Sequence, residues 1–196
     1  AIKARRPLQE IKSWNAQFCE YSNRIHDLRL EYIEQLTPLI HNLLTELIPN
    51  IPRLTLNYSR GWPEDRSLDV SLEKGIHQDM RLGYTQNGPH RADFQLLFQS
   101  IPVKDYLSQG QQKLAAYAIS CAQGQLLSIL TNKKPIYLID DLPSELDQSR
   151  QDAVTGILSS LESQVFITAI HSSNVTKSLL TRATLFHMEQ GKLTKL

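Results

Sequence analysis

Two short stretches in the second half of the chain carry residue types that could act on a phosphorylated ligand. Ser108 and Gly110 stand at the start of a segment whose apolar residues recur at helical spacing. Asp140 and Asp141 directly follow the apolar run Ile136–Ile139, which is typical of a buried parallel strand. A helix N-terminus favours anions, and carboxylates can hold Mg²⁺ or direct an attacking water. These residue types therefore permit the binding and hydrolysis of a nucleotide.

The serine-glycine segment has two interpretations. Ser-x-x-Gln is a capping box, in which serine and glutamine satisfy backbone N–H groups at a helix start, and by itself it needs no further role. Gly110 adds a second interpretation, because a residue without a side chain lets a phosphate approach the positive end of the helix. On this second interpretation the candidate phosphate contacts are Ser108, Gln109, Gly110 and Gln111.

The two aspartates lie where open α/β sheets bind their ligands, beyond the carboxyl end of a strand. At that place Asp140 can hold Mg²⁺ through water, and Asp141 can orient or deprotonate the water that attacks a phosphate. The alternative is a strand that ends in a polar turn, with Asp141 solvated and Asp147 capping the next helix.

The apolar spacing also predicts the elements that must position these residues. After Ser108 it predicts α/β alternation, with a helix to about 130, a strand over 135–140, a helix over 146–161, a strand over 164–169, a short helix after 174 and a hairpin over 184–195. Before Ser108, the pattern predicts a helix over 8–48 that is kinked at Pro38 and ended by Pro49 and Pro52. A strand over 53–59, a helix over 68–81, strands over 82–86 and 92–99, and a third strand over 103–106 are predicted to follow.

This order predicts three parts. We expect residues 1–52 to form a helical arm, residues 53–106 a connector of strands and a helix, and residues 107–196 a parallel-sheet lobe. The chain has 196 residues, 41% apolar residues and a formal charge of +1, which suits a globular chain and excludes a long nucleic-acid-coating tail. No apolar run approaches the roughly 20 residues of a membrane span, so we expect no membrane partner. Two isolated cysteines favour a reduced cytoplasm, and the first residue, Ala1, indicates a fragment or a processed piece.

The run from Leu107 to Asp147 resembles the ABC-type ATPases and, within them, the C-terminal part of the RecF family of DNA replication and repair proteins, relatives of the SMC heads. The resemblance depends on Tyr-Leu-Ile-Asp-Asp, on the Ser-Glu-Leu-Asp that follows, on the long interval between Ser108 and Asp140, and on the Gly-Pro-His-Arg-Ala-Asp of Gly88–Asp93. Gln164–Ala169 fits the next strand of the family. The implied fold class is α/β, an SMC-head-like lobe preceded by a helical arm and short antiparallel strands. The lobe lacks its Walker A half, because no G-x-x-x-x-G-K-[ST] occurs in the sequence.

The resemblance also implies a site. Its cofactors are ATP and Mg²⁺, with Asp140 on the metal through water and Asp141 catalytic. Ser108–Gln111 is the signature motif that contacts the ATP of a second subunit, and Ser144 and Asp147 belong to the D-loop at the dimer seam. We expect slow hydrolysis, since Asp141 stands where many relatives carry the longer glutamate, and no hydrolysis by this chain alone.

At the level of function, the resemblance implies a cytoplasmic, weakly active DNA-dependent ATPase of DNA repair, recombination, replication and the SOS response. The intact protein would form an ATP-dependent homodimer on gapped DNA and act with a RecR-like recombination mediator. The alternatives are an SMC-like or transporter-type nucleotide-binding domain, and a non-catalytic protein-interaction module. The long Ser108–Asp140 interval, the Asp-Asp pair and the helical arm disfavour a transporter.

Four features keep two interpretations each. His171 is either a phosphate sensor or a surface-loop residue, since the position where many ABC ATPases carry a histidine is Ala169 here. His90 and Arg91 either shape a turn or support the nucleotide lobe or a DNA-facing surface. The aromatic residues at helical spacing are expected to pack rather than to stack on bases; they are Trp14, Phe18, Tyr21 and Tyr32. The basic residues of the arm either contact phosphates or form a solvated face; they are Arg5, Arg6, Lys12, Arg24 and Arg29.

Overall fold

The computed structural model describes residues 8–196, so the expected basic residues Arg5 and Arg6 lie outside the described part. The chain divides into two compact units, which are described separately. The first unit comprises Ala1–Thr37 and Leu54–Pro102, and the second comprises Pro38–Arg53 and Val103–Leu196. The three-part division expected from the sequence stays a prediction.

The helical start of the chain is formed by α1 (Leu8–Ser13) and α2 (Asn15–Leu47). The helical segment is broken at Trp14, between α1 and α2. We had expected a kink at Pro38 instead, but α2 continues through that residue. The helix ends at Leu47, two residues before Pro49, and the prediction that Pro49 ends it is confirmed.

A small antiparallel sheet follows in the first unit, with the strand order β1 (Leu54–Ser59), β2 (Asp93–Phe98) and β3 (Ile101–Pro102). Its β1–β2 register runs from Leu54 opposite Phe98 to Ser59 opposite Asp93. The expected strand over 103–106 is wrong, because those residues form the short helix α4 (Val103–Tyr106). The expected strand over 82–86 is also wrong, because α3 (Leu68–Leu82) reaches Leu82 and the left-handed Gly83 then ends it.

The core of the first unit forms where α2 meets the start of α3. Trp62, Leu68 and Leu72 are buried together, with Phe18 and Cys19 of α2 packed against them. Of the four aromatic residues expected to pack, Phe18 does so, whereas the other three are exposed, at 58% for Trp14, 51% for Tyr21 and 38% for Tyr32. The packing expectation therefore holds for Phe18 and is wrong for the rest.

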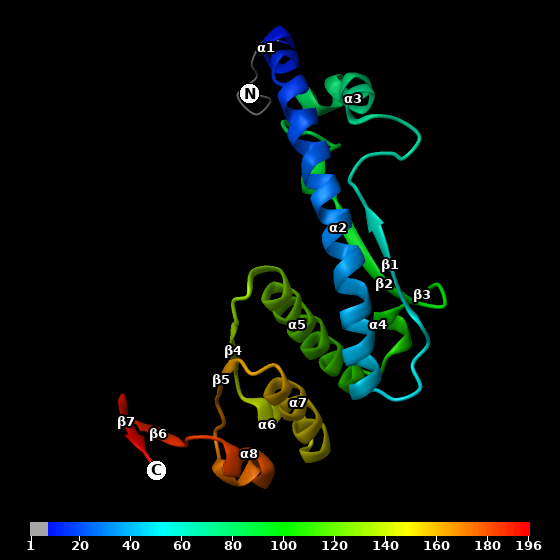
Figure 1. The fold of residues 1–196 in the computed structure, drawn as a ribbon. Helices are drawn as coiled ribbons and strands as arrows, with labels where there is room; N and C mark the ends of the chain where they lie inside the picture. Colours follow the sequence, from blue (N-terminus) through cyan, green and yellow to red (C-terminus); the bar gives the residue numbers. More distant parts are fainter. Residues whose placement is uncertain (1–7) are drawn as a thin grey trace. The chain divides into compact units, whose positions relative to one another are not determined.

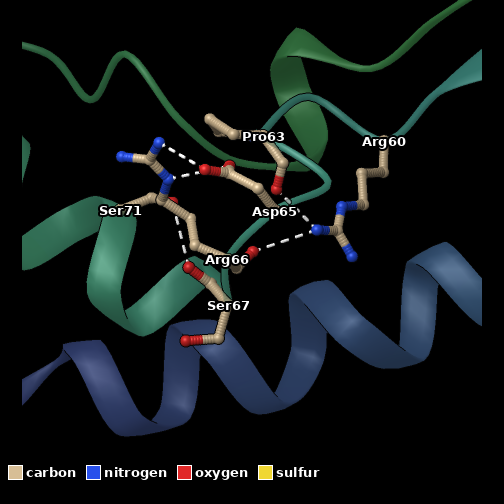
Figure 2. A network of polar contacts seen from close by, with 6 residues as sticks. All are labelled: Arg60, Pro63, Asp65, Arg66, Ser67 and Ser71. Carbon is tan, nitrogen blue, oxygen red and sulfur yellow. Dashed lines mark hydrogen bonds and ion pairs between the residues drawn. The ribbon is translucent and has the colours of Figure 1, made fainter.

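The loop between β1 and α3 is held by one arginine side chain (Figure 2). Arg60 donates from Nη2 to the carbonyl oxygens of Pro63 (2.6 Å) and Arg66 (3.0 Å), and its guanidinium lies 5.0 Å from the centre of the Trp62 ring. Beside it, Arg66 forms a two-bond pair with Asp65, at 2.9 and 2.7 Å. Ser67 then caps α3, since its hydroxyl accepts from the Val70 N–H.

The second unit has the expected α/β alternation. After the end of α2 and α4 come α5 (Gln109–Thr131), β4 (Ile136–Ile139), α6 (Leu142–Glu145), α7 (Gln148–Ser160), β5 (Gln164–Ile167), η2 (Ser172–Asn174), α8 (Lys177–Arg182), β6 (Phe186–Glu189) and β7 (Lys192–Lys195). β4 and β5 pair in parallel, with Ile136 opposite Gln164 and Ile139 opposite Ile167, and α5 packs against α7 (Figure 1). The terminal hairpin β6–β7 turns at Gln190 and Gly191, as predicted.

One face of the parallel pair is exposed. Ile136 is 60% exposed and Leu138 77%, and Phe166 on β5 is 51% exposed. The expectation that this strand is covered on both faces is therefore wrong for the described residues. The other face is partly buried: the Tyr137 ring lies against Gly124 of α5, its hydroxyl donates to the Cys121 carbonyl oxygen, and burial raises the pKa of Tyr137 to about 12.

By length and composition, α5 is the single helix in the described part that could cross a membrane. This is weak evidence, since a core helix of a globular protein has the same composition. The buried face of α5 includes Leu114, Ala118 and Leu126. Burial also raises the pKa of the Cys121 thiol to about 11, so this cysteine packs as a small apolar group.

Candidate functional site

The two aspartates lie at the carboxyl end of β4, and a threonine from the neighbouring strand joins them. The Thr168 hydroxyl donates to Asp140 Oδ1 at 2.6 Å and accepts from the Asp141 N–H at 2.8 Å. The Thr168 N–H in turn donates to the Ile139 carbonyl oxygen at 3.0 Å, which extends the pairing of β4 with β5. Thr168 therefore fixes the orientation of the Asp140 carboxylate and the position of the Asp141 backbone.

Asp141 has a left-handed backbone, with φ 44° and ψ 49°. This conformation costs roughly 1 kcal/mol for a residue other than glycine, although aspartate tolerates it better than most. Its carbonyl oxygen accepts from both the N–H and the hydroxyl of Ser144, each at 3.0 Å. The Asp141 carboxylate makes no capping bond to α6, so this strain is not offset by a helix cap. Strain at a polar residue near a ligand-binding edge is typical of functional sites.

The end of the loop is formed by Asp147, which caps α7. Its Oδ1 accepts from the Arg150 N–H at 3.0 Å and from the Ser149 hydroxyl at 2.9 Å. These two bonds lower the pKa of Asp147, and the bond from the Arg150 backbone has the larger effect. The cap role that the sequence offered as the alternative for Asp147 is thus present.

The expected capping box is formed at the start of α5. The Gln111 N–H donates to Ser108 Oγ at 3.4 Å, and the Ser108 N–H donates to Gln111 Oε1 at 3.0 Å. The space beside Gly110 holds the guanidinium of Arg150, because a Cβ built on Gly110 would lie 2.6 Å from Arg150 Nη1. The glycine therefore accommodates a cation from α7.

The signature segment, Ser108–Gln111, contacts the carboxylate loop, Asp140–Asp147, through Arg150, whose guanidinium lies beside Gly110 and pairs with Asp147, and an ion pair of Lys113 also joins α5 to this loop. Lys113 Nζ on α5 lies 2.6 Å from Glu145 Oε2, and Arg150 Nη1 lies 3.3 Å from Asp147 Oδ2. The structure thus links Ser108–Gln111 to Ser144–Asp147, and Ser144 to Asp141. His171 stands apart: it is exposed and precedes η2, and within residues 8–196 no hydrogen bond joins its ring to either aspartate. Its role as a phosphate sensor stays a prediction.

Thr168 and Arg150 are the residues that sequence reasoning missed. Thr168 carried a usable signal, since it follows β5, and the carboxyl ends of parallel strands meet at one edge of a sheet. Arg150 carried no such signal, because it reaches Gly110 from 40 positions further along the chain and its sequence neighbours indicate only a helix start.

The Gly88–Asp93 segment forms a tightly built turn in the first unit. The Gly88 N–H donates to the Gly61 carbonyl oxygen at 3.0 Å, and Arg29 Nη1 donates to the Pro89 carbonyl oxygen at 2.7 Å. The His90 ring contacts the Thr85 carbonyl oxygen at 2.9 Å, and Arg91 lies 5.9 Å from the centre of the Tyr84 ring. These contacts favour the turn-shaping interpretation of His90 and give Arg29 a partner.

The donor set of the site fits a nucleotide-bound Mg²⁺ better than a protein-caged metal. Among residues 8–196 no three His, Cys, Asp or Glu side chains gather to hold a metal ion. Mg²⁺ keeps several waters and takes phosphate oxygens, so one carboxylate is enough at a nucleotide site. The hydrogen bond from Thr168 uses Asp140 Oδ1, and the second oxygen of this carboxylate suits a metal-bound water.

Comparison with known proteins gives concordant likenesses. The protein-family model described as RecF/RecN/SMC N terminal domain matches residues 24–194. The DNA replication and repair protein RecF of Coxiella burnetii (strain CbuG_Q212) is 45% identical over 196 residues, which are all of this chain and 54% of that protein. The chain thus spans about half the length of the curated relatives it matches.

Solved structures show the same relationship. The structure of the recombination mediator protein RecF-ATPrS in the RecFOR pathway superposes with a TM-score of 0.77 and 29% identity, over 97% of this chain and 52% of that one. The SMC head bound to the C-winged helix domain of ScpA shares the fold, with a TM-score of 0.52 at 14% identity, over 93% of this chain and 49% of that one. These likenesses confirm the expected α/β, SMC-head-like fold class and the resemblance to RecF.

Proposed function

This chain belongs to the RecF/RecN/SMC N-terminal domain family, and from that premise we propose that it is the C-terminal part of an ATP-dependent DNA repair clamp. The clamp works in the cytoplasm, in replication, recombination and the SOS response, and hydrolyses ATP slowly when bound to DNA. The observation that carries the proposal is the Thr168 hydroxyl, which holds Asp140 and the strained Asp141 together at the carboxyl end of β4.

Two carboxylates divide the work at this edge. Asp140 would hold Mg²⁺, and the bound ion would supply positive charge that neutralises the phosphate oxygens of ATP. Asp141 orients the attacking water and accepts its proton, which general bases do most effectively within hydrogen-bond reach. An aspartate reaches about one methylene less far than a glutamate, so we expect slow turnover. Ser144 keeps Asp141 in its strained conformation by donating to its carbonyl oxygen.

The signature segment serves the ATP of a second subunit. Ser108, Gln109, Gly110 and Gln111 present a hydroxyl and the positive end of α5 to that nucleotide, while Ser144 and Asp147 line the seam of the dimer. ATP then closes a homodimer on DNA, and hydrolysis opens it. Gapped DNA as the ligand and a RecR-like mediator as the partner follow from the family resemblance. The RecF structures, described as a recombination mediator protein in the RecFOR pathway, support a place in recombination.

The exposed apolar face of β4 and β5 supports the proposal that this chain supplies only part of the ATPase lobe. Ile136, Leu138 and Phe166 leave a large apolar area in water, which a globular domain normally covers. In the intact protein the half of the lobe that carries the phosphate-cradling loop covers this face. The chain by itself therefore hydrolyses no ATP.

Sedimentation of the intact protein with and without Mg²⁺-ATP tests the clamp. We expect an ATP-dependent dimer that Ser108→Arg abolishes, since a long cation at the start of α5 blocks the second nucleotide. Ser120→Arg, an exposed serine further along the same helix, is the matched control and should dimerise as the wild type does. A mass that responds neither to ATP nor to Ser108→Arg would leave Ser108 as a helix cap and favour a protein-interaction module.

A further inference from the structure

We propose that Arg150 is a positioning residue that makes the signature segment and the D-loop one mechanical unit. Its guanidinium joins Asp147, the last residue of the carboxylate loop, to Gly110, in the first turn of α5. This inference rests on the proposed ATP-driven dimer and adds to it the residue that keeps two of its contact elements in register.

The contact with Gly110 is a close one. A Cβ on Gly110 would lie 2.6 Å from Nη1, 3.2 Å from Cζ and 3.4 Å from Nη2 of Arg150. All three distances belong to one planar group, so the guanidinium lies against the glycine with Nη1 nearest. A real Cβ essentially never comes within 3.0 Å of another heavy atom, so any side chain at this position must displace the guanidinium. The glycine therefore lets the guanidinium occupy the place that a side chain at position 110 would take.

The same nitrogen of the guanidinium is paired with Asp147. Nη1 lies 3.3 Å from Oδ2 of Asp147, whose Oδ1 already accepts from the Arg150 N–H. Arg150 thus contacts the cap residue Asp147 through both its backbone N–H and its side chain. The ion pair of Lys113 with Glu145, at 2.6 Å, runs parallel to this link one turn further along α5.

The energetics separate positioning from stability. The side chains of Arg150 and Asp147 are 40% and 55% exposed, and exposed ion pairs contribute little to the free energy of unfolding. Loss of the Arg150 side chain should therefore leave the melting temperature nearly unchanged. Its effect should appear where both joined segments are used at once, in closing on the nucleotide of a second subunit.

A double-mutant cycle on the intact protein tests the coupling, with ATP-dependent dimer affinity measured by sedimentation. We expect Arg150→Ala to weaken the dimer about tenfold, which corresponds to about 1.4 kcal/mol. Gly110→Ala should weaken it by a similar factor in the wild type and less than about twofold in the Arg150→Ala background, because the guanidinium it displaces is then absent. Arg182→Ala, an exposed arginine of α8, is the matched control and should leave the affinity unchanged.

Equal losses from Gly110→Ala in both backgrounds would overturn the inference, since glycine would then serve phosphate access alone. Wild-type affinity in Arg150→Ala would overturn it as well. A wild-type protein that forms no ATP dimer contradicts the proposed function instead, and a second measurement then decides the coupling. Amide hydrogen exchange of this chain should be several-fold faster at Gln111 and Gln112 in Arg150→Ala, and unchanged exchange there would refute the link.

Discussion

Among the turns that place a residue at positive φ, those at Gly88 and Asp141 do so for opposite reasons. Gly88, in the Gly88–Asp93 turn of the first unit, has φ 144° and ψ 175°, a region open essentially to glycine alone. Asp141, in the second unit, has φ 44°, where glycine would also be the least strained residue. At the first turn the chain uses the residue that fits the backbone. At the second it keeps an aspartate despite the strain.

The surroundings of the two turns explain this difference. A Cβ on Gly88 would lie 2.8 Å from Phe18 Cζ, so a side chain there would strike the core of the first unit. Asp141 is partly buried, and its backbone is held by Thr168 and Ser144 while its carboxylate makes no capping bond. The first turn serves packing. The second leaves the Asp141 carboxylate without a capping bond, as the proposed catalytic role requires. Substitutions at the first turn should therefore lower stability, and those at the second should lower activity.

The largest effect is expected for Asp141→Asn in the intact protein. Loss of the group that orients and deprotonates water should lower ATP turnover by about 10²–10⁴-fold, the usual range for a general base. Asp141→Gly should lower turnover as strongly, yet it relieves the left-handed strain and should leave the free energy of unfolding unchanged or raise it by up to about 1 kcal/mol. Steady-state turnover and chemical denaturation measure both. Full turnover in either variant would place the catalytic base elsewhere.

At the other turn, Gly88→Ala should act on stability. The forbidden backbone region and the contact with Phe18 together should lower the free energy of unfolding by about 2–4 kcal/mol. Gly156→Ala is the matched control, because a Cβ there meets nothing within 4 Å inside α7, and it should stabilise by about 0.5–1 kcal/mol. Urea denaturation of this chain measures both. A neutral Gly88→Ala would mean that the turn can rearrange.

A smaller effect is expected for Thr168→Val, which removes the hydroxyl between the aspartates. Without it the Asp140 carboxylate and the Asp141 N–H lose a shared partner, and turnover of the intact protein should fall about tenfold, typical of one lost orienting hydrogen bond of about 1.4 kcal/mol. Thr131→Val at the far end of α5 loses a hydroxyl bond of similar length, 2.7 Å, and should keep wild-type turnover. Equal turnover in the two variants would remove Thr168 from the site.

The smallest effect concerns a buried carboxylate of the first unit. Asp79 is 1% exposed, its Oδ1 accepts from the Gln86 N–H, and its Oδ2 has no hydrogen-bond partner in the described part of the chain. Burial raises the pKa of Asp79. The folded state then holds its proton more tightly than the unfolded state, so stability falls as pH rises from the unfolded pKa through the folded one.

Asp79→Asn stays neutral and should remove this part of the pH dependence. We expect it to raise the free energy of unfolding by about 1 kcal/mol at pH 7 and to have little effect at pH 3. Urea denaturation across that range measures the difference, with the exposed Asp27→Asn as control. If the wild-type free energy of unfolding instead rose with pH, and Asp79→Asn removed that rise, the pKa of Asp79 would be lowered by folding and the prediction would be wrong.

Sequence reasoning succeeded where the deciding interactions are local. The capping box of Ser108 and Gln111 and the termination of α2 before Pro49 depend on residues a few positions apart, and both are present. The errors come from tertiary context. Val103–Tyr106 was predicted to be a strand but forms a helix. Leu138 belongs to an apolar run that is typical of a covered strand, but its side chain is exposed.

The candidate site shows the same division. Asp140 and Asp141 could be predicted because they directly follow an apolar strand. Thr168 required the pairing of β4 with β5, which topology rules could have supplied. The place of Arg150 against Gly110 depends on how α7 packs on α5, and no periodicity in the sequence encodes that contact.

The uncovered face of β4 and β5 also has a consequence for the life of the protein in the cell. Exposed apolar strands are the surface that chaperones retain and proteases clear before assembly. While Leu138 and Phe166 are uncovered, we therefore expect the chain to be a target of both, and covering this face should remove the target.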